Sequence, residues 1–414
     1  MSSDRRAVDV GPLNGLRVVE LASEAAAHCG KLLADLGAEV ILVEPRHGHH
    51  TRWFEPFVDD APDPNRSLWF WTYNTSKLGV GLDLDDVTDG ELFRRLVARA
   101  DAVLEAEPIG RLAGLGLDHD TLRLAHPSLV WTSVTPFGRA TSRSDEQAND
   151  LTISASGGMA WSCGYDDNTL PPVRGSGGQS NHTASLWAAI ATLIALHARD
   201  TTGNGQFIDV SMHAAANVTT EQATQYWLIA GKVVQRQTGR HASHRPTEPV
   251  MARDVNGHEV HTGFPPKTER QLTTLLEWLD ALGLRDEFSA APFLEIAVAA
   301  GGIDLSKLHD DPMVQECYRA VREAMVFIAS RLTAREFFVQ AQDRGFPVGA
   351  VYAPEEVMTD PHIVARNFPT PVFDHRLGRE VIYPGAPIRF TRSPWRISRP
   401  APDRAQDQAI LDTI

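Results

Sequence analysis

The chain has 414 residues, of which 43% are hydrophobic and 22% charged, and 39 Lys and Arg against 53 Asp and Glu give a formal net charge of −14. This composition excludes a mainly disordered chain, because enough apolar material is present to offset chain entropy. The acidic balance argues against a nucleic-acid-binding protein, which needs a basic surface. Any anionic ligand must therefore be held by a local group of cationic side chains.

Cysteine usage and hydropathy indicate the compartment. Cys29, Cys163 and Cys317 are far apart and odd in number, so neither a disulfide framework nor a zinc site follows from their spacing. The N-terminal residues lack the apolar segment of a signal peptide, and the most apolar stretch, 185–198, is too short to span a bilayer. We therefore predict a cytoplasmic protein that binds neither metal nor membrane.

The N-terminal part of the chain alternates between strand and helix patterns. Strands are expected at 16–21, 39–43, 80–84, 102–104 and 129–134, and helices at 25–36 and 91–100. Two strands joined by a helix within thirty residues are typical of a parallel sheet with right-handed crossovers. The sequence therefore predicts a doubly wound, Rossmann-like α/β domain.

The middle of the chain is less regular. Glycine and proline pairs predict a long loop region over 135–180, followed by a helix at 183–199, a strand at 206–210 and a helix at 213–229. Loops of that length in compact domains are usually functional.

Composition changes near residue 231 and again after residue 345. Helices are expected at 269–282 and 315–332, and short strands at 348–352, 372–373 and 388–390. We predict a large domain over 1–225, a linker and small α/β domain over 226–345, and a return to the large domain over 346–414.

Sequence motifs give one candidate ligand site. The turn after the first strand has no G-x-G-x-x-G, and the chain contains neither a Walker A sequence nor a G-x-S-x-G elbow. The loop 44–52 carries Arg46, Arg52 and three histidines, and Lys77 precedes a neighbouring strand. These cations suit a phosphorylated adenine nucleotide, or they form a basic cluster without a ligand. A solvated loop explains the histidines better than a metal site, because no carboxylate has suitable spacing.

Longer segments resemble the family III CoA-transferases, which include formyl-CoA transferase, carnitine CoA-transferase and the α-methylacyl-CoA racemases. The similar segments are PLNGLRVVEL, KLLADLGAEVILVEP, NTSKLGVGLDL, ELFRRLVARADAVLE, TGNGQFIDVSMHAA and PVGAVYAPEEVMTDPH. They cover nearly the whole chain in the order and spacing of that family.

The resemblance implies a Rossmann-like domain built from both ends of the chain, a smaller domain from its middle, and an intertwined homodimer. It also implies that coenzyme A binds at the large domain as an acyl-CoA substrate, beside a carboxylic acid. The positions expected to line the CoA site are Arg46, Arg52, Lys77, Leu82 and Glu107. Glu107 stands where an aromatic residue is common in the family, and an acid there does not favour a nearby phosphate.

Family chemistry starts from an Asp carboxylate that attacks the thioester, and a mixed anhydride and an enzyme thioester follow. The matching position here is Gln179, in GSGGQSNHTAS, and an amide does not form that anhydride. The racemases place a His–Asp dipeptide upstream, where this chain has Asn149 and Asp150.

Three hypotheses remain open. The first is CoA transfer by a modified route, in which Asp150 acts as acid or nucleophile and the Gln179 amide binds the thioester carbonyl. Alternatively, Asp150 only caps the following helix. The second is a catalytically silent CoA-binding subunit paired with an Asp-containing homologue. The third is an acyl-CoA racemase, epimerase or lyase using His182 and His28. Acyl specificity is expected to depend on loop residues such as Trp161, Tyr165 and Arg174.

Overall fold

The protein consists of two compact units, which we describe separately. The computed structural model describes residues 10–220, 222–308 and 310–414. The first unit combines the chain up to Trp161 with Val173–Gly231 and Met358–Ile414, and the second combines Ser162–Pro172 with Lys232–Val357.

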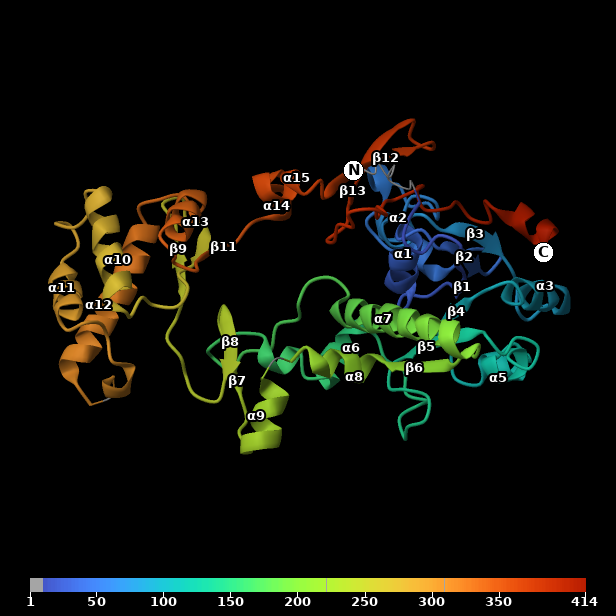
Figure 1. The fold of residues 1–414 in the computed structure, drawn as a ribbon, viewed down its shortest axis with the longest axis horizontal. Helices are drawn as coiled ribbons and strands as arrows, with labels where there is room; N and C mark the ends of the chain where they lie inside the picture. Colours follow the sequence, from blue (N-terminus) through green and yellow to red (C-terminus); the bar gives the residue numbers. More distant parts are fainter. Residues whose placement is uncertain (1–9, 221, 309) are drawn as a thin grey trace, which may run out of the picture. The chain divides into compact units, whose positions relative to one another are not determined.

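A six-stranded sheet forms the centre of the first unit (Figure 1). Its strands are β1 (Arg17–Leu21), β2 (Glu39–Glu44), β3 (Leu78–Gly81), β4 (Ala102–Glu105), β5 (Val130–Thr135) and β6 (Phe207–Ser211). Every neighbouring pair is parallel, and the order is β3-β2-β1-β4-β5-β6. This is the strand order of the Rossmann fold, so the predicted fold class is confirmed.

Both faces of this sheet are buried, which explains why its strands are continuous apolar runs. Val18 faces a core cluster shared with α1 (Ala27–Asp35) and α7 (Gln179–Thr202), and α7 runs along the sheet in Figure 1. Val19, the next residue, faces the opposite cluster with α3 (Val87–Val97). The alternation of side chains along a strand therefore supplies two separate cores.

The C-terminal segment covers the outer edge of β3. The Gln408 side chain accepts a hydrogen bond from the Gly81 amide (2.9 Å) and donates one to the Gly81 carbonyl (3.2 Å). Asp407 accepts from the Gly79 amide at 2.9 Å. These side chains satisfy backbone groups that an exposed edge strand would leave open to another chain.

Three predicted irregular or helical regions differ from the structure. The region 135–180 contains a short helix, α6 (Asp150–Ser156), which Asn149 starts with a capping box. The predicted helix over 213–229 is two helices, α8 (Met212–Val218) and α9 (Ala223–Ala230). Helix α7 begins at Gln179, four residues before the predicted start.

The predicted strand at 388–390 is wrong. The last strands are instead β12 (Pro369–Asp374) and β13 (Arg379–Pro384), which form an antiparallel hairpin. Pro384 and Pro387 bracket the chain before Ile388. Proline has no amide hydrogen, so a new ladder does not start there.

The second unit is mainly helical around a small antiparallel sheet of order β11-β10-β9. Its sheet strands are β9 (Met251–Arg253), β10 (Glu259–His261) and β11 (Gly349–Ala350), and a separate hairpin pairs β7 (Gln235–Gln237) with β8 (Arg240–Ser243). Its main helices are α10 (Glu269–Ala281), α11 (Ala291–Ala299), α12 (Pro312–Ala329) and α13 (Ala334–Asp343). Trp278, Phe337 and Phe346 stack in its core.

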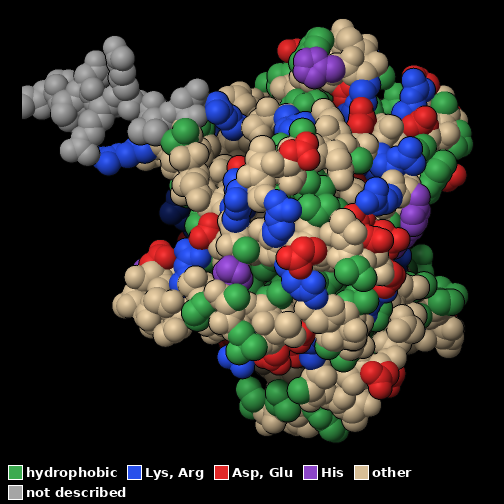
Figure 2. Space-filling view, turned by 90° about the vertical axis from the view of Figure 1, so that its right-hand side faces the viewer, with side chains coloured by type: hydrophobic (Ala, Val, Ile, Leu, Met, Phe, Trp, Pro, Cys, Tyr) green, Lys and Arg blue, Asp and Glu red, His purple; other side chains and the backbone are tan. Residues whose placement is uncertain are grey.

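Shorter helices connect these elements. They are α2 (Leu68–Tyr73), α4 (Arg111–Gly114), α5 (His119–Leu122), α14 (Pro354–Thr359) and α15 (Pro361–Ala365), with 3-10 turns η1 (His50–Trp53), η2 (Val58–Asp60), η3 (Ala160–Ser162), η4 (Leu305–Lys307) and η5 (Gln408–Thr413). Within the described ranges, none of the helices combines the length and the apolar character needed to cross a membrane. Basic and acidic side chains are interspersed on the face shown in Figure 2.

Candidate active site

The sheet topology defines where a ligand is expected. The strand order reverses between β1 and β4, and in open α/β sheets ligands bind outside the carboxyl ends of the strands at this point. The β1 side of this crevice is the turn Ala22–Ala26, which leads into α1. The β4 side is the segment from Glu105 to Gly110.

The first turn of α7 packs against the turn after β1. Asn181 donates a hydrogen bond from Nδ2 to Glu24 Oε1 at 2.7 Å, and the Ser185 hydroxyl donates to the Ala25 carbonyl at 2.7 Å. These contacts bring the N-terminus of a 24-residue helix, with its outward-pointing amide groups, to the switch point. Such a helix end favours negative charge developing on a bound carbonyl or carboxylate.

Gln179 is the first residue of α7, and its side chain is exposed. The Nε2 group donates to the Ser176 carbonyl at 2.8 Å, within the glycine-rich loop that precedes the helix. The backbone carbonyl of Gln179 accepts a hydrogen bond from the Thr183 hydroxyl one turn later. The second amide hydrogen of Gln179 is accordingly available for a ligand oxygen.

The structure brings Asp150 together with the start of α7. Asp150 Oδ1 accepts hydrogen bonds from the Ser180 amide (2.8 Å) and the Ser180 hydroxyl (2.5 Å). Oδ2 is buried, has no hydrogen-bond partner among the described residues, and lies 3.6 Å from Nη1 of Arg174, whose side chain is 43% exposed. The carboxylate therefore sits one residue away from Gln179, with one oxygen fixed to the backbone of α7.

His28 and His182 also meet in this region, beside Tyr73. The Tyr73 hydroxyl and His182 Nε2 are 2.6 Å apart, and the two imidazole ring centres are 4.9 Å apart. Burial, together with the smaller effect of the neighbouring His182, lowers the pKa of His28 to about 4. Burial likewise lowers the pKa of His182 and raises the pKa of Tyr73, so all three groups are uncharged at neutral pH.

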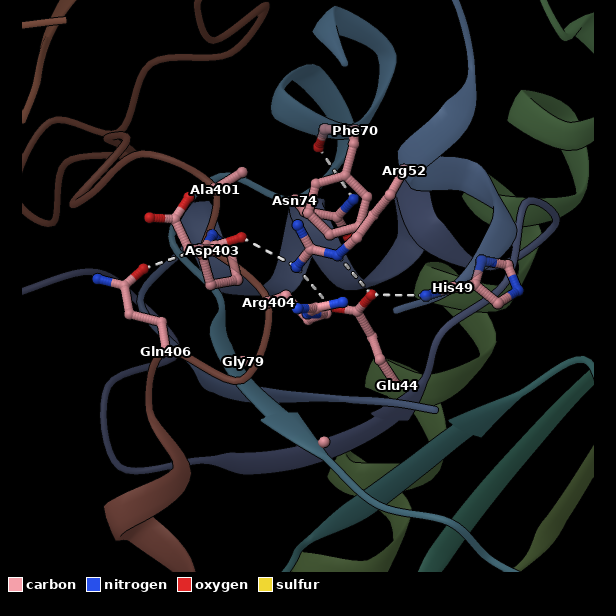
Figure 3. Close-up of polar contacts among 12 residues, drawn as sticks. Glu44, His49, Arg52, Phe70, Asn74, Gly79, Ala401, Asp403, Arg404 and Gln406 are labelled. Carbon is pink, nitrogen blue, oxygen red and sulfur yellow. Dashed lines mark hydrogen bonds and ion pairs between the residues drawn. The ribbon is translucent and has the colours of Figure 1, made fainter. Parts of the chain in front are cut away.

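The cations expected to hold phosphate are each bound to a carboxylate of the chain. Arg52 is fully buried and donates two hydrogen bonds of 2.7 Å to Glu44, with its guanidinium 3.9 Å from the Phe70 ring centre (Figure 3). Lys77 is also fully buried, 2.8 Å from Glu20. In the present arrangement both cations are buried and paired within the chain, so neither is free to bind a phosphate.

Arg46 is the cation of this set that solvent reaches. Its guanidinium pairs with Asp89 through bonds of 2.7 and 2.6 Å, yet the side chain is 65% exposed. Leu82 is a buried member of the core beside α3. Glu107 pairs with Arg111 at 3.0 Å, and burial raises the pKa of its carboxyl. The structure therefore places these positions in separate environments.

Loop residues named for acyl specificity fall in different places. Trp161 and Arg174 belong to the first unit, whereas Tyr165 belongs to the second. Trp161 and Tyr165 are exposed.

Sequence reasoning missed two residues of this site, Glu24 and Asn181. The signal for Glu24 was present, because it follows the first strand of a predicted parallel sheet, where ligands bind. Asn181 carried no such signal, since its role depends on the packing of α7 against a turn 157 residues away.

The chain is similar to known proteins over nearly its whole length. Succinyl-CoA:(R)-benzylsuccinate CoA-transferase subunit BbsE of Thauera aromatica is 30% identical over 93% of this chain and 90% of its own length. Succinate–glutarate CoA-transferase of Agrobacterium fabrum is 28% identical over 97% and 96%. A crystal structure of a CAIB/BAIF family protein from Brucella suis superposes with a TM-score of 0.77 at 24% identity, over 98% of this chain and 99% of that one.

These relatives are CoA-transferases, which use CoA thioesters as substrates, and the Brucella structure shares the fold. Residues 13–408 of this chain match the sequence model of CoA-transferase family III. The resemblance found in the sequence is thereby confirmed, and the chain, a protein of the CoA-transferase class, belongs to CoA-transferase family III.

Proposed function

We propose that this chain is the CoA-thioester-binding subunit of a CoA-transferase, in which a second chain of the same family supplies the carboxylate nucleophile. The observation that carries this proposal is Gln179 at the first position of α7, where the family resemblance implies an aspartate. The segment 175–197 contains neither Asp nor Glu. An amide is a far poorer nucleophile than a carboxylate.

The environment of Asp150 supports a structural rather than a nucleophilic role. One oxygen is occupied by two donors of Ser180, and the side chain is 7% exposed. A nucleophile must present a lone pair to the thioester carbon, whereas Oδ1 is held by Ser180 and Oδ2 is buried 3.6 Å from Arg174 Nη1.

Exposed apolar surfaces support a partner chain. Leu186, Trp187, Ile190 and Ile194 form a stripe along α7 and are each between 44% and 62% exposed. Leu186, Ile190 and Ile194 are spaced by four residues and Trp187 and Ile190 by three, which places the four side chains on one helix face. Helix α9 adds three exposed apolar side chains, Trp227, Leu228 and Ile229. Large apolar side chains grouped in this way are typical of subunit interfaces.

BbsE, the relative that is 30% identical, is itself described as a subunit. A homologous partner is therefore a reasonable occupant of these surfaces.

The proposed division of labour follows from the chemistry. The partner carboxylate attacks the thioester carbonyl, the carbon–sulfur bond breaks, and CoA leaves as a thiolate. That thiolate attacks the partner's carbonyl in the mixed anhydride, releasing the first carboxylic acid and leaving CoA as an enzyme thioester. The acceptor carboxylate then attacks this thioester and displaces the CoA thiolate, which leaves a second mixed anhydride between the acceptor and the partner carboxylate. The thiolate attacks the acceptor carbonyl of that anhydride, so the new CoA thioester forms and the partner carboxylate is released. In this scheme the α7 terminus and the Gln179 amide hold the thioester carbonyl.

The test compares the isolated chain with its complex. Calorimetry of the purified chain should show saturable binding of CoA, whereas transfer of CoA from succinyl-CoA to any acid should be absent. A family III chain with Asp at the position of Gln179 should co-purify from the source cells, and the pair should restore transfer. Full turnover by this chain alone would refute the proposal.

A pair of substitutions sharpens the assignment. Gln179→Asp should give the isolated chain measurable transfer activity, because it places a carboxylate on the same backbone. Gln179→Asn is the matched control, since it has the same length as Asp and no charge, and it should stay inactive. Deuterium uptake from solvent at the α-carbon of a bound acyl-CoA would point to the racemase or lyase chemistry instead.

A further inference from the structure

A row of aromatic and imidazole rings runs along the first unit from the end of β2 to α7. Successive ring centres lie 5.5 Å (His50–Phe54), 5.2 Å (Phe54–Trp69), 4.6 Å (Trp69–Tyr73), 5.5 Å (Tyr73–His182) and 4.9 Å (His182–His28) apart. These separations are those of interacting aromatic pairs. We name these six residues the aromatic row.

Helix α2 holds the centre of the row in place. Trp69 and Tyr73 are four residues apart, so they share one helix face, while Phe70 and Trp71 point into the core. The Ser67 hydroxyl accepts from the Phe70 amide and donates to the Phe54 carbonyl at 2.6 Å. The α2 helix and the segment before it are thereby fixed to each other.

The rings of the row are neither fully buried nor fully exposed, apart from His50, which is exposed. Half-buried rings that are held rigidly offer a preformed apolar surface at little entropic cost on binding. At the inner end, Nδ1 of His28 is buried and makes no hydrogen bond within the described chain. A buried ring nitrogen of this kind is suited to a polar group of a ligand.

The charges next to the row bear on the class of ligand that it can bind. The two lysines that act on His28, Lys31 and Lys77, are paired with Asp35 and Glu20, and the acidic residues Glu24 and Asp150 act on Tyr73 and His182. The row contains no Lys, Arg, Asp or Glu, and the Tyr73 and His182 polar atoms bond to each other at 2.6 Å. A second carboxylate, as in a dicarboxylic acyl group, would find no cation among these rings. An aromatic ring would instead find stacking and edge contacts.

The row ends beside the expected reaction centre. His182 lies three residues after Gln179 in the first turn of α7, next to Asn181 and its partner Glu24. We propose that the aromatic row binds the aryl part of an aromatic carboxylic acid carried as its CoA thioester, and so sets the acyl specificity of this site. This inference rests on the proposed function, because it requires that the chain bind a CoA thioester at α7.

The test is a calorimetric comparison of ligands on the full chain, or on its complex with the second subunit. Benzoyl-CoA and phenylacetyl-CoA should bind about tenfold more tightly than acetyl-CoA, and succinyl-CoA should show no gain over acetyl-CoA. The ranking obtained with the unmodified protein tests the inference whether or not any variant folds.

Two matched substitutions locate the effect. Trp69→Leu should remove the preference for aryl thioesters and leave the affinity for free CoA unchanged. Trp53→Leu is the control, because Trp53 is 55% exposed in the neighbouring turn η1 and lies outside the row, and it should keep the preference. Equal affinity for aryl and acetyl thioesters in the unmodified protein would overturn the inference while CoA binding stood. Failure to bind CoA at all would instead remove the proposed function.

Discussion

Asp150 of α6 fastens the first turn of α7, since its Oδ1 atom lies 2.8 Å from the Ser180 amide nitrogen and 2.5 Å from the Ser180 hydroxyl. A carboxylate at the N-terminus of a helix satisfies an amide that the helix itself leaves without a partner. The same contact sets the position of Gln179, which precedes Ser180 in the chain. Asp150 is therefore a positioning residue for the candidate site.

We expect Asp150→Ala to lower the free energy of unfolding by about 2 kcal/mol, because the Ser180 amide loses its acceptor inside the protein. Asp150→Asn keeps an acceptor oxygen and should cost less. Urea unfolding at fixed protein concentration measures both. Asp145→Ala is the control, an exposed aspartate from the preceding loop, and should change stability by less than about 0.5 kcal/mol. Equal stabilities for Asp150→Ala and the control would contradict this assignment.

Gly30 is required by the buried pair of Glu20 and Lys77. A Cβ at Gly30 would lie 1.7 Å from Glu20 Oε2 and 3.0 Å from Lys77 Nζ. Gly30→Ala should therefore push two fully buried charges apart and destabilise the protein by about 3 kcal/mol or more. Gly114→Ala, in α4 with open space around its Cα, should be neutral or slightly stabilising. Thermal unfolding of the two variants side by side decides the matter, and similar melting temperatures would show that the pair tolerates the methyl group.

Much of the sheet could be predicted because local signals and tertiary packing agree there. Strands such as β2 are apolar on both faces, and helices between them end at glycines such as Gly37. The hydrophobic pattern and the turn residues therefore predict the same element boundaries. The predicted strand at Ile388 failed because a short apolar run carries no information about its partner. The division of the 213–229 segment into α8 and α9 was likewise hidden, since both halves have helical composition.

The candidate site was harder to predict than the fold. Gln179 and Asp150 were singled out by resemblance, and their proximity through Ser180 appears only when α6 and α7 pack together. Arg52 and Lys77 have the residue types of a phosphate site, but sequence gives no sign that Glu44 and Glu20 neutralise them. Arg52 lies in the turn η1 and Lys77 just before β3, so these pairs depend on how the loops pack against β1 and β2, which sequence patterns do not show.

Arg46 and Arg52 should respond differently to substitution. Arg46 is exposed, so Arg46→Ala should weaken CoA binding several-fold if its guanidinium contacts a phosphate. The protein should stay folded, because the buried Asp89 carboxylate keeps the Asp83 amide as a donor at 2.7 Å. Arg52→Ala leaves the buried Glu44 carboxylate without its partner and should lower the free energy of unfolding by roughly 3 to 5 kcal/mol. Calorimetric titration with CoA and urea unfolding separate the two effects. Unchanged CoA affinity in Arg46→Ala would remove this residue from the proposed CoA site.

The imidazole of His28 should make stability depend on pH. Burial lowers the pKa of His28 from 6.5 to about 4 in the folded chain, so between these values the unfolded chain binds more protons. The contribution of His28 is therefore fully present above pH 6.5 and is lost as the pH falls toward 4. With about 1.4 kcal/mol for each pKa unit, the loss is on the order of 3 kcal/mol. His28→Gln removes the titrating group, so the difference in unfolding free energy between the two proteins should change over this interval and level off above pH 7. Curves that stay parallel from pH 4 to pH 8 would show that His28 is protonated equally easily in the folded and unfolded chains.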